Sequence, residues 1–264
     1  MSNLDLSNVK RIFTFGCSFT DFYWSTWANI LAYDNPFAEF YNFGHLGCAN
    51  NYTASMVTQA DAYYKFCSTD LVVVQWTEFN RESRWIDREG GWCHGGSVYN
   101  NRYYTKEFVK NYCHPQHFLL RDSALIHLTQ HFVAATTARH AFLTMSPLPP
   151  NSLYDDTFAR IKKPIATALW GDGGCGHKAW LNQQEIHPAL TDSHPSPLDH
   201  LQYLRSMLGV FVKQLTISAV EDNDKLVKLQ LQENCANKDP APWCLDRTTH
   251  VLRQSDSISH TIIR

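Results

Sequence analysis

The segment IFTFGCSFT, residues 12–20, is the part of the sequence that decides the fold. Its first half is an apolar, β-prone run that stops at Gly16, and this pattern predicts a buried first strand over residues 10–16. The apolar residues that follow recur at the spacing of an amphipathic helix: Trp24, Trp27, Ala28 and Leu31. Ser18 is therefore predicted to lie in the turn between a strand and a helix.

Ser18 suits two roles in such a turn. A serine before an amphipathic run commonly serves only as the N-cap of the helix. Its hydroxyl would also stand at the carboxyl edge of a sheet, beside backbone N–H groups that can stabilise a developing negative charge. We therefore regard Ser18 as a candidate nucleophile, and a nucleophilic serine requires a base elsewhere in the chain.

The rest of the sequence alternates between strand and helix patterns. Apolar runs predict strands over residues 40–43, 71–76 and 141–145, and helical spacing predicts helices over residues 51–66 and 118–138. One face of the second helix is expected to be buried: Leu125, Leu128, Phe132 and Ala135. This alternation predicts an α/β sandwich with a mainly parallel central sheet, in which ligands bind beyond the carboxyl ends of the strands.

We expect one catalytic domain over residues 1–220 and a polar, irregular C-terminal extension over residues 221–264 that packs on it. Two irregular insertions interrupt the domain, at about residues 82–116 and 151–190. The first is rich in tryptophan and tyrosine, which either pack within a long loop or stack on a sugar ring. The second is glycine-rich and is interpreted as a flexible wall or lid.

The composition excludes several classes of function. The net charge is −2, and the lysines and arginines are scattered, which argues against a nucleic-acid partner. No signal peptide or transmembrane segment is visible, so we expect a cytoplasmic protein. The eight cysteines match no disulfide framework and are expected to be free thiols. No paired cysteine or histidine spacing indicates zinc, and we expect no metal and no cofactor.

The segment TDSHPSPLDH, residues 191–200, contains a helix start. Ser196 is placed to be the N-cap, Pro197 the first helical residue, and Asp199 the acidic half of a capping box. The next helix is therefore predicted to begin here. His200, in its first turn, is expected to pack against its neighbours.

Asp192 and His194 remain in the loop before that helix. They are two positions apart, so in an extended loop both side chains project to the same side. The carboxylate can then orient the imidazole through one ring nitrogen while the other nitrogen faces a hydroxyl. We therefore predict a catalytic triad of Ser18, His194 and Asp192.

Three loops of the chain resemble conserved blocks of the SGNH/GDSL hydrolase superfamily. Residues 15–20 (FGCSFT) are similar to the first block, and residues 42–50 (NFGHLGCAN) are similar to the second. Residues 192–195 (DSHP) resemble the last block, which is usually Asp-x-x-His. The resemblance implies a flavodoxin-like three-layer α/β/α sandwich with Ser18 as the nucleophile of an acyl-transfer reaction.

The resemblance also implies an oxyanion hole. The backbone N–H groups of Ser18 and Gly47 are two of its donors. The third block of the family has a Gly-x-Asn-Asp turn, whereas this chain has WTEFNR, residues 76–81. Asn80 is the candidate for the side-chain donor, with Asn50 as the alternative.

These features predict a serine hydrolase that cleaves a small-molecule or carbohydrate ester, for example by deacetylating a carbohydrate. One alternative is an O-acyltransferase that acts on a glycan with the same residues. A second alternative is a binding or structural module on this fold that has lost the chemistry, since the third block is altered.

Overall fold

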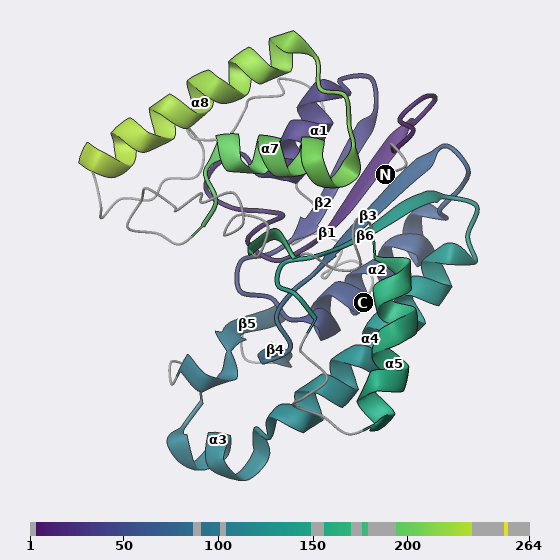
Figure 1. Ribbon diagram of the computed structural model, residues 1–264, viewed down its shortest axis with the longest axis vertical. Coiled ribbons are helices and arrows are strands. Elements are labelled where there is room, and N and C mark those ends of the chain that lie inside the picture. The colour runs from purple at the N-terminus through teal and green to yellow at the C-terminus, as the bar shows by residue number, and fades with distance from the viewer. Residues whose placement is uncertain are drawn as a thin grey trace.

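The computed structural model describes residues 4–86, 91–100, 104–148, 156–169, 176–178, 194–233 and 251–252. At its centre is a parallel sheet with the strand order β6-β3-β1-β2-β7 (Figure 1). Its strands are β1 (Arg11–Gly16), β2 (Glu39–Gly44), β3 (Asp70–Trp76), β6 (Arg139–Thr144) and β7 (Val251–Leu252). A separate antiparallel hairpin is formed by β4 (Arg81–Ile86) and β5 (Gly91–Ser97).

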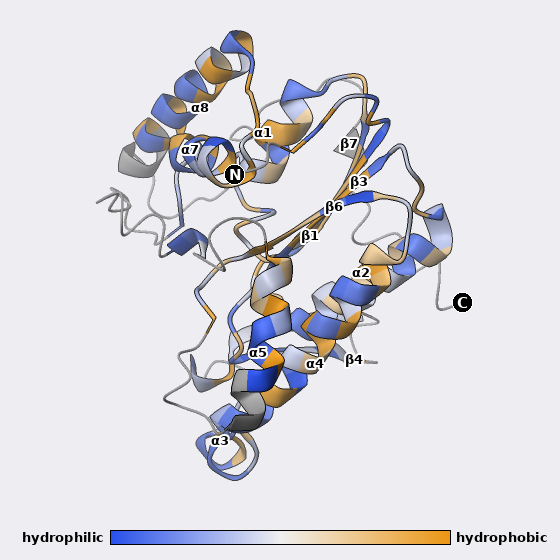
Figure 2. Cartoon of the chain, turned by 45° about the vertical axis from the view of Figure 1, so that its right-hand side comes forward, coloured by the Kyte–Doolittle hydropathy of each residue, from blue (hydrophilic) through white to orange (hydrophobic). Residues whose placement is uncertain are grey.

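Helices cover both faces of the sheet, as Figures 1 and 2 show. One face is covered by α1 (Trp27–Asp34), α7 (Pro197–Leu208) and α8 (Gln214–Glu233). The other is covered by α2 (Asn50–Tyr64), α4 (Pro115–Ala134) and α5 (Asp156–Ala168). The 3-10 turn η1 (Val98–Asn100) and α3 (Lys106–Tyr112) connect the hairpin to α4. The predicted α/β sandwich with a parallel central sheet is confirmed.

The central strands are buried on both faces, and their side chains alternate between two cores. Ile12 belongs to the core under α1 and α7, whereas Phe13 belongs to the core under α2 and α4. On the latter face, Phe13 stacks on Tyr41 and Phe15 stacks on Phe43 across β1 and β2, with ring centroids 4.8 and 5.0 Å apart. These cross-strand pairs fix the register of β1, the strand that leads to Ser18.

The first helix begins later than its sequence pattern predicted. Its N-cap is Thr26, whose backbone N–H donates to Asn29 Oδ1 at 3.0 Å and whose hydroxyl donates to the carbonyl of Thr20 at 2.7 Å. The helix therefore starts at Trp27, and Ser18 lies in a separate turn well before it. The alternative that Ser18 is only the N-cap of this helix is wrong, and so is the expectation that the helix start supplies N–H groups beside it.

The buried face of α4 also differs from the prediction. Leu128 is 66% exposed and Phe132 is 37% exposed, whereas Ile126 and Val133 are fully buried. The helix packs against α2 and α5 through a face that contains several polar residues: Asp122, Ser123, Thr129 and Gln130. Because these buried residues are polar, the spacing of the apolar residues did not identify the buried face correctly.

The regions expected to be irregular contain regular elements. The first insertion folds into the hairpin β4–β5, η1 and α3, and the second contains α5. Helix α8 continues across the boundary expected at residue 220, so the expectation of an irregular chain is wrong for residues 221–233. The glycine cluster of residues 170–175 lies outside the described residues.

The predicted start of α7 is confirmed. Ser196 is the N-cap, with the Asp199 N–H donating to its hydroxyl oxygen at 3.4 Å, and the N–H of Ser196 donates to Asp199 Oδ2 at 2.8 Å. Leu201, Leu204 and Leu208 are buried in the core beneath the helix. This capping box fixes where the loop that carries His194 ends.

Candidate active site

Ser18 and His194 meet beyond the carboxyl end of β1. His194 Nε2 lies 2.8 Å from Ser18 Oγ, although the two residues are 176 positions apart in the sequence. Ser18 sits in a tight turn in which the carbonyl of Cys17 accepts from the N–H groups of Thr20 and Asp21, at 2.8 and 3.1 Å. The distance between hydroxyl and imidazole is that of a hydrogen bond, and it is short enough for proton transfer.

Gly16 is required at the end of β1 because the turn folds back on it. A Cβ atom at Gly16 would lie 2.2 Å from Thr20 Oγ1 and 3.0 Å from the carbonyl oxygen of Gln75. Thr20 Oγ1 in turn donates to Gln75 Oε1 on the neighbouring strand β3, at 3.1 Å. The strand must therefore end in glycine for Ser18 to be presented at this edge.

Two neighbours of Ser18 position the His194 ring. The ring stacks on Phe22 with centroids 3.8 Å apart and an interplanar angle of 18°, and Phe19 meets its edge at 5.7 Å. Trp24 Nε1 donates to the carbonyl of Pro195 at 2.7 Å, which ties the loop before α7 to the loop after β1. The segment after Ser18 thus holds the imidazole with Nε2 facing the hydroxyl.

Asp192, the predicted orienting carboxylate, lies outside the described residues. Its role as the third member of the triad therefore stays a prediction.

Gly47 lies in the loop after β2 with a left-handed backbone, φ +71°. The hairpin packs on this loop, because the N–H of Gly96 donates to the carbonyl of Gly47 at 3.0 Å. Among the described residues, the backbone N–H groups of Ser18 and Gly47 have no hydrogen-bond acceptor. Both residues line the same cavity, so the oxyanion hole of these two donors stays a prediction.

The two asparagines considered as side-chain donors are engaged elsewhere. Asn50 is buried, and its amide donates to the carbonyl of Thr77 at 3.2 Å and to Asp122 Oδ2 at 2.9 Å. Asn80 donates to Ser97 Oγ in the hairpin at 3.2 Å. Among the described residues that line the cavity at Ser18, neither asparagine is present. The structure does not bring either amide to the nucleophile.

The cavity at Ser18 has a volume of about 830 Å³ and is lined by the loops after β1, β2 and β3, the hairpin and His194. The described residues that line it are Ser18, Phe22, Tyr23, His45, Leu46, Gly47, Glu78, Arg81, Trp92, Cys93, His94, Gly95, Gly96, Ser97, Asn100 and His194. Sequence reasoning missed Arg81 and His94. Both belong to the β4–β5 hairpin, whose sequence shows no periodicity that would predict two strands.

His94 is held at the cavity wall by the hairpin. Ser83 Oγ accepts from the N–H of Ala49 at 2.9 Å and lies within hydrogen-bond distance of His94 Nδ1, at 2.9 Å. Burial, together with the charge of His45, lowers the pKa of His94 to about 3. His94 therefore contributes no charge to the cavity wall at neutral pH.

Glu78 and two cations form the charged part of the site. Lys178 Nζ lies 2.7 Å from Glu78 Oε1, and Arg81 Nη2 lies 3.5 Å from Glu78 Oε2. Burial works to raise the pKa of Glu78, but the hydrogen bond from Lys178 and the charge of Arg81 outweigh it and lower the pKa. Glu78 is therefore ionised at neutral pH.

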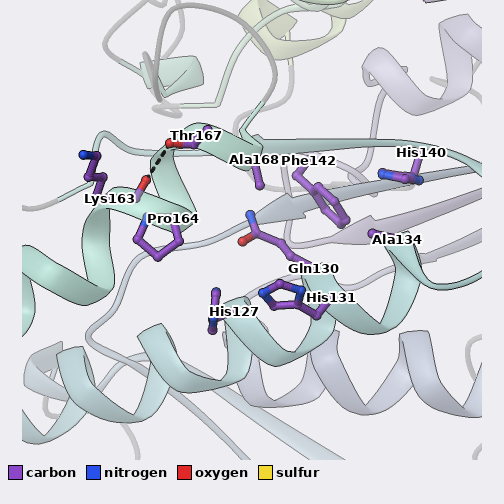
Figure 3. A pocket seen from close by; sticks show the side chains of 10 residues that line it. All are labelled: His127, Gln130, His131, Ala134, His140, Phe142, Lys163, Pro164, Thr167 and Ala168. Carbon is purple, nitrogen blue, oxygen red and sulfur yellow. Dashed lines mark hydrogen bonds between the residues drawn. The ribbon is translucent and has the colours of Figure 1, made fainter.

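A second cavity of about 500 Å³ lies between α4, β6 and α5 (Figure 3). Figure 3 shows the Gln130 side chain pointing from α4 into the space below Pro164 and Ala168 of α5. The imidazoles of His127 and His131 meet edge to face at 4.4 Å on its α4 side. Ser18 and His194 take no part in this cavity, which we call the α4–α5 groove.

The described residues contain no group of three or more histidine, cysteine or acidic side chains arranged to hold a metal ion. The five cysteines among them are free thiols: Cys17, Cys48, Cys67, Cys93 and Cys113. Within the same part of the chain, no helix has both the length and the apolar character needed to cross a membrane.

No family model matches this sequence, and no curated protein matches it. Among solved structures, the chain is similar to the crystal structure of the protein YxiM from Bacillus subtilis, with a TM-score of 0.45 and 12% sequence identity. The match covers 76% of this chain and 55% of that protein.

Proposed function

We propose that the protein is a serine hydrolase of the SGNH/GDSL type that cleaves an ester bond through an acyl-enzyme. In this proposal Ser18 is the nucleophile, His194 is the general base and Asp192 orients the imidazole. The observation that carries it is the 2.8 Å approach of His194 Nε2 to Ser18 Oγ at the wall of a cavity. A binding module would not need this pair aligned beside two free backbone donors.

The proposed reaction has two halves. His194 Nε2 takes the proton of Ser18 as Oγ attacks the ester carbonyl, and the resulting oxyanion accepts from the N–H groups of Ser18 and Gly47. His194 then gives the proton to the leaving alcohol, and the acyl group stays on Oγ. In the second half His194 takes a proton from the water that attacks the acyl-enzyme and returns it to Ser18 Oγ as the acid leaves.

Aromatic side chains on the cavity wall support a carbohydrate ester as one substrate class. Tyr23 and Trp92 both line the cavity that contains Ser18, and aromatic faces stack on sugar rings. The same feature supports the second candidate, an O-acyltransferase, in which a sugar hydroxyl replaces water in the second half of the reaction. Product analysis with an ester donor and a sugar acceptor present together separates transfer from hydrolysis.

The proposal is tested by the hydrolysis of para-nitrophenyl acetate by wild-type protein and by Ser18→Ala. We expect the substitution to lower kcat at least about 10³-fold, because residual catalysis without the nucleophile is small. Ser206→Ala on α7, at an exposed position, is the matched control and should keep wild-type activity. Equal rates in wild type and Ser18→Ala would remove the proposal and leave the binding-module alternative.

A further inference from the structure

Arg81 is the first residue of β4 and lines the cavity at Ser18, yet its side chain is only 12% exposed. A guanidinium carries five N–H donors. Within the described part of the chain, Nη2 has two long contacts, to Glu78 Oε2 at 3.5 Å and to Met145 Sδ at 3.8 Å. Nε is buried without an acceptor, and Nη1 makes no hydrogen bond to a described residue. The described residues therefore use little of the hydrogen-bonding capacity of this cation.

The guanidinium is linked to the turn that carries Ser18 through one methionine. Met145 Sδ is 3.8 Å from Arg81 Nη2 and also 3.2 Å from the thiol sulfur of Cys17, the residue before Ser18. One side chain thus separates Arg81 from the turn that carries the proposed nucleophile. Arg81 and Ser18 also line the same cavity, so a substrate bound at Ser18 can extend to Arg81.

The charges around Arg81 do not balance. Glu78 is the only carboxylate among the described residues that line the cavity, and Lys178 is its closer cation, at 2.7 Å compared with 3.5 Å for Arg81. His94 on the same wall is neutral at pH 7, as its pKa of about 3 requires. Among the described residues, Arg81 thus shares the carboxylate of Glu78 with Lys178. A largely buried cation that shares its carboxylate with a closer lysine is incompletely neutralised, and an anion from outside would complete the site.

We propose that Arg81 binds a carboxylate of the substrate, so that the natural ester is anionic close to its scissile bond. This inference rests on the proposed hydrolase function and adds the substrate class to it. The planar guanidinium matches the geometry of a carboxylate and pairs with it through parallel hydrogen bonds. Arg81 is then the specificity-determining residue of the cavity.

The test compares three aryl esters: neutral para-nitrophenyl acetate, mono-para-nitrophenyl succinate with a carboxylate on the acyl side, and acetoxybenzoate with a carboxylate on the alcohol side. For wild-type protein, kcat/KM should be at least about tenfold higher for one of the anionic esters than for neutral para-nitrophenyl acetate. Arg81→Met should abolish this preference by lowering kcat/KM for the anionic ester more than for the acetate, and Arg81→Lys should retain part of it. Arg84→Met is the matched control, because Arg84 lies on the same strand, is 51% exposed and does not line the cavity.

Two results would overturn the inference. One is a wild-type protein that hydrolyses esters without preferring either anionic compound. The other is an Arg81→Met protein that loses activity on all three esters equally, which would indicate a role in folding or in oxyanion stabilisation.

Calorimetry with monomethyl succinate separates this outcome from a failure of the proposed function. Ser18→Ala protein should bind the compound, and Ser18→Ala with Arg81→Met should bind it at least about tenfold more weakly. Such Arg81-dependent binding without Ser18-dependent hydrolysis would reject the hydrolase and keep the anion site. Absence of binding to Ser18→Ala would reject the site itself.

Discussion

The cavity at Ser18 and the α4–α5 groove both contain histidines, but they are built differently. The first collects residues from the loops after β1, β2 and β3, from the hairpin and from the loop before α7. The second is lined by three elements that follow one another in the chain, α4, β6 and α5. Only the first places an imidazole within hydrogen-bond distance of a serine hydroxyl among its described lining residues. Alignment of groups, rather than the number of histidines, distinguishes a candidate catalytic site.

The topology of the sheet explains this difference. Parallel strands all end at one edge, so loops that are far apart in the sequence converge there. The α4–α5 groove is lined by His140 and Phe142 in the body of β6 and by side chains from the two helices that cover it. The packing of neighbouring helices is sufficient to explain such a groove, without any role in catalysis.

Removing an imidazole from each cavity gives the largest expected contrast. His194→Ala should lower kcat for para-nitrophenyl acetate at least about 10³-fold, because Ser18 loses its general base. His131→Ala in the α4–α5 groove should keep wild-type kcat. Comparable losses in the two variants would contradict the distinction between the cavities.

Gly47→Ala should give the next largest effect. The left-handed backbone at φ +71° strains any other residue, and a Cβ would lie 3.4 Å from the carbonyl oxygen of His94. We expect the N–H of Gly47 to move and kcat to fall about 10- to 100-fold, with KM less affected.

Gly209→Ala is the matched control for that substitution. Gly209 ends α7 with a left-handed φ of +59°, so the same change should cost about 1 kcal/mol of stability there. Its kcat should remain that of the wild type. A Gly47→Ala protein that loses stability but keeps full kcat would show that the Gly47 N–H is not an oxyanion donor.

Acid should destabilise the protein through the histidines packed near the Ser18 cavity. Burial, and then the charge of His194, lowers the pKa of His200 to about 3. Below the ordinary histidine pKa of about 6.5 the unfolded chain takes up a proton that folded His200 does not. Stability is therefore fully present near pH 7 and falls as the pH decreases towards 3, by up to about 1.4 kcal/mol per pH unit for one such histidine.

Guanidinium unfolding at pH 7 and pH 5 measures this slope. His200→Phe should reduce it by about one proton's contribution, whereas His131→Phe, at an exposed position of the α4–α5 groove, should leave it unchanged. An unaltered slope in His200→Phe would mean that His200 is not held neutral in the folded state.

The smallest expected effect concerns Gln130 in the α4–α5 groove. It is 4% exposed, its Oε1 has no hydrogen-bond partner among the described residues, and its Nε2 reaches only the carbonyl of Ile165 at 3.5 Å. Gln130→Leu should therefore stabilise the protein by about 1 kcal/mol, since it removes an unsatisfied buried oxygen. Thermal unfolding tests this, and esterase activity should not change. If the Gln130→Leu protein is less stable than the wild type, the amide of Gln130 must have a hydrogen-bond partner or bind a ligand.

The sequence predicted the features that depend on local pattern. The apolar runs of the four central strands and the capping residues Ser196 and Asp199 each carry their structural information within a few residues. Ser18 and His194 could be selected because each stands beside such an element. Their 2.8 Å separation was not predictable from either segment alone, since it depends on how Phe22 and Trp24 pack against the loop before α7.

The features that sequence reasoning missed depend on tertiary contacts. Strand β5 contains three glycines and shows no alternation, and it is held by pairing with β4 and by the Gly96 contact to Gly47. The path of the loop after β3 places Arg81 in the cavity and turns Asn80 towards Ser97. A shift of one residue in such a loop changes which side chain reaches the site, and composition does not specify it.

If Ser18 is a nucleophile activated by His194, it should react covalently with a serine-directed reagent at a rate that depends on His194. The protein is treated with a serine-directed fluorophosphonate, digested and analysed by peptide mass spectrometry. We predict a single phosphonylated site at Ser18 in the wild type and at least about 10³-fold slower labelling in His194→Ala. Wild-type protein that remains unlabelled at Ser18, or a His194→Ala protein labelled there at the wild-type rate, would contradict the account.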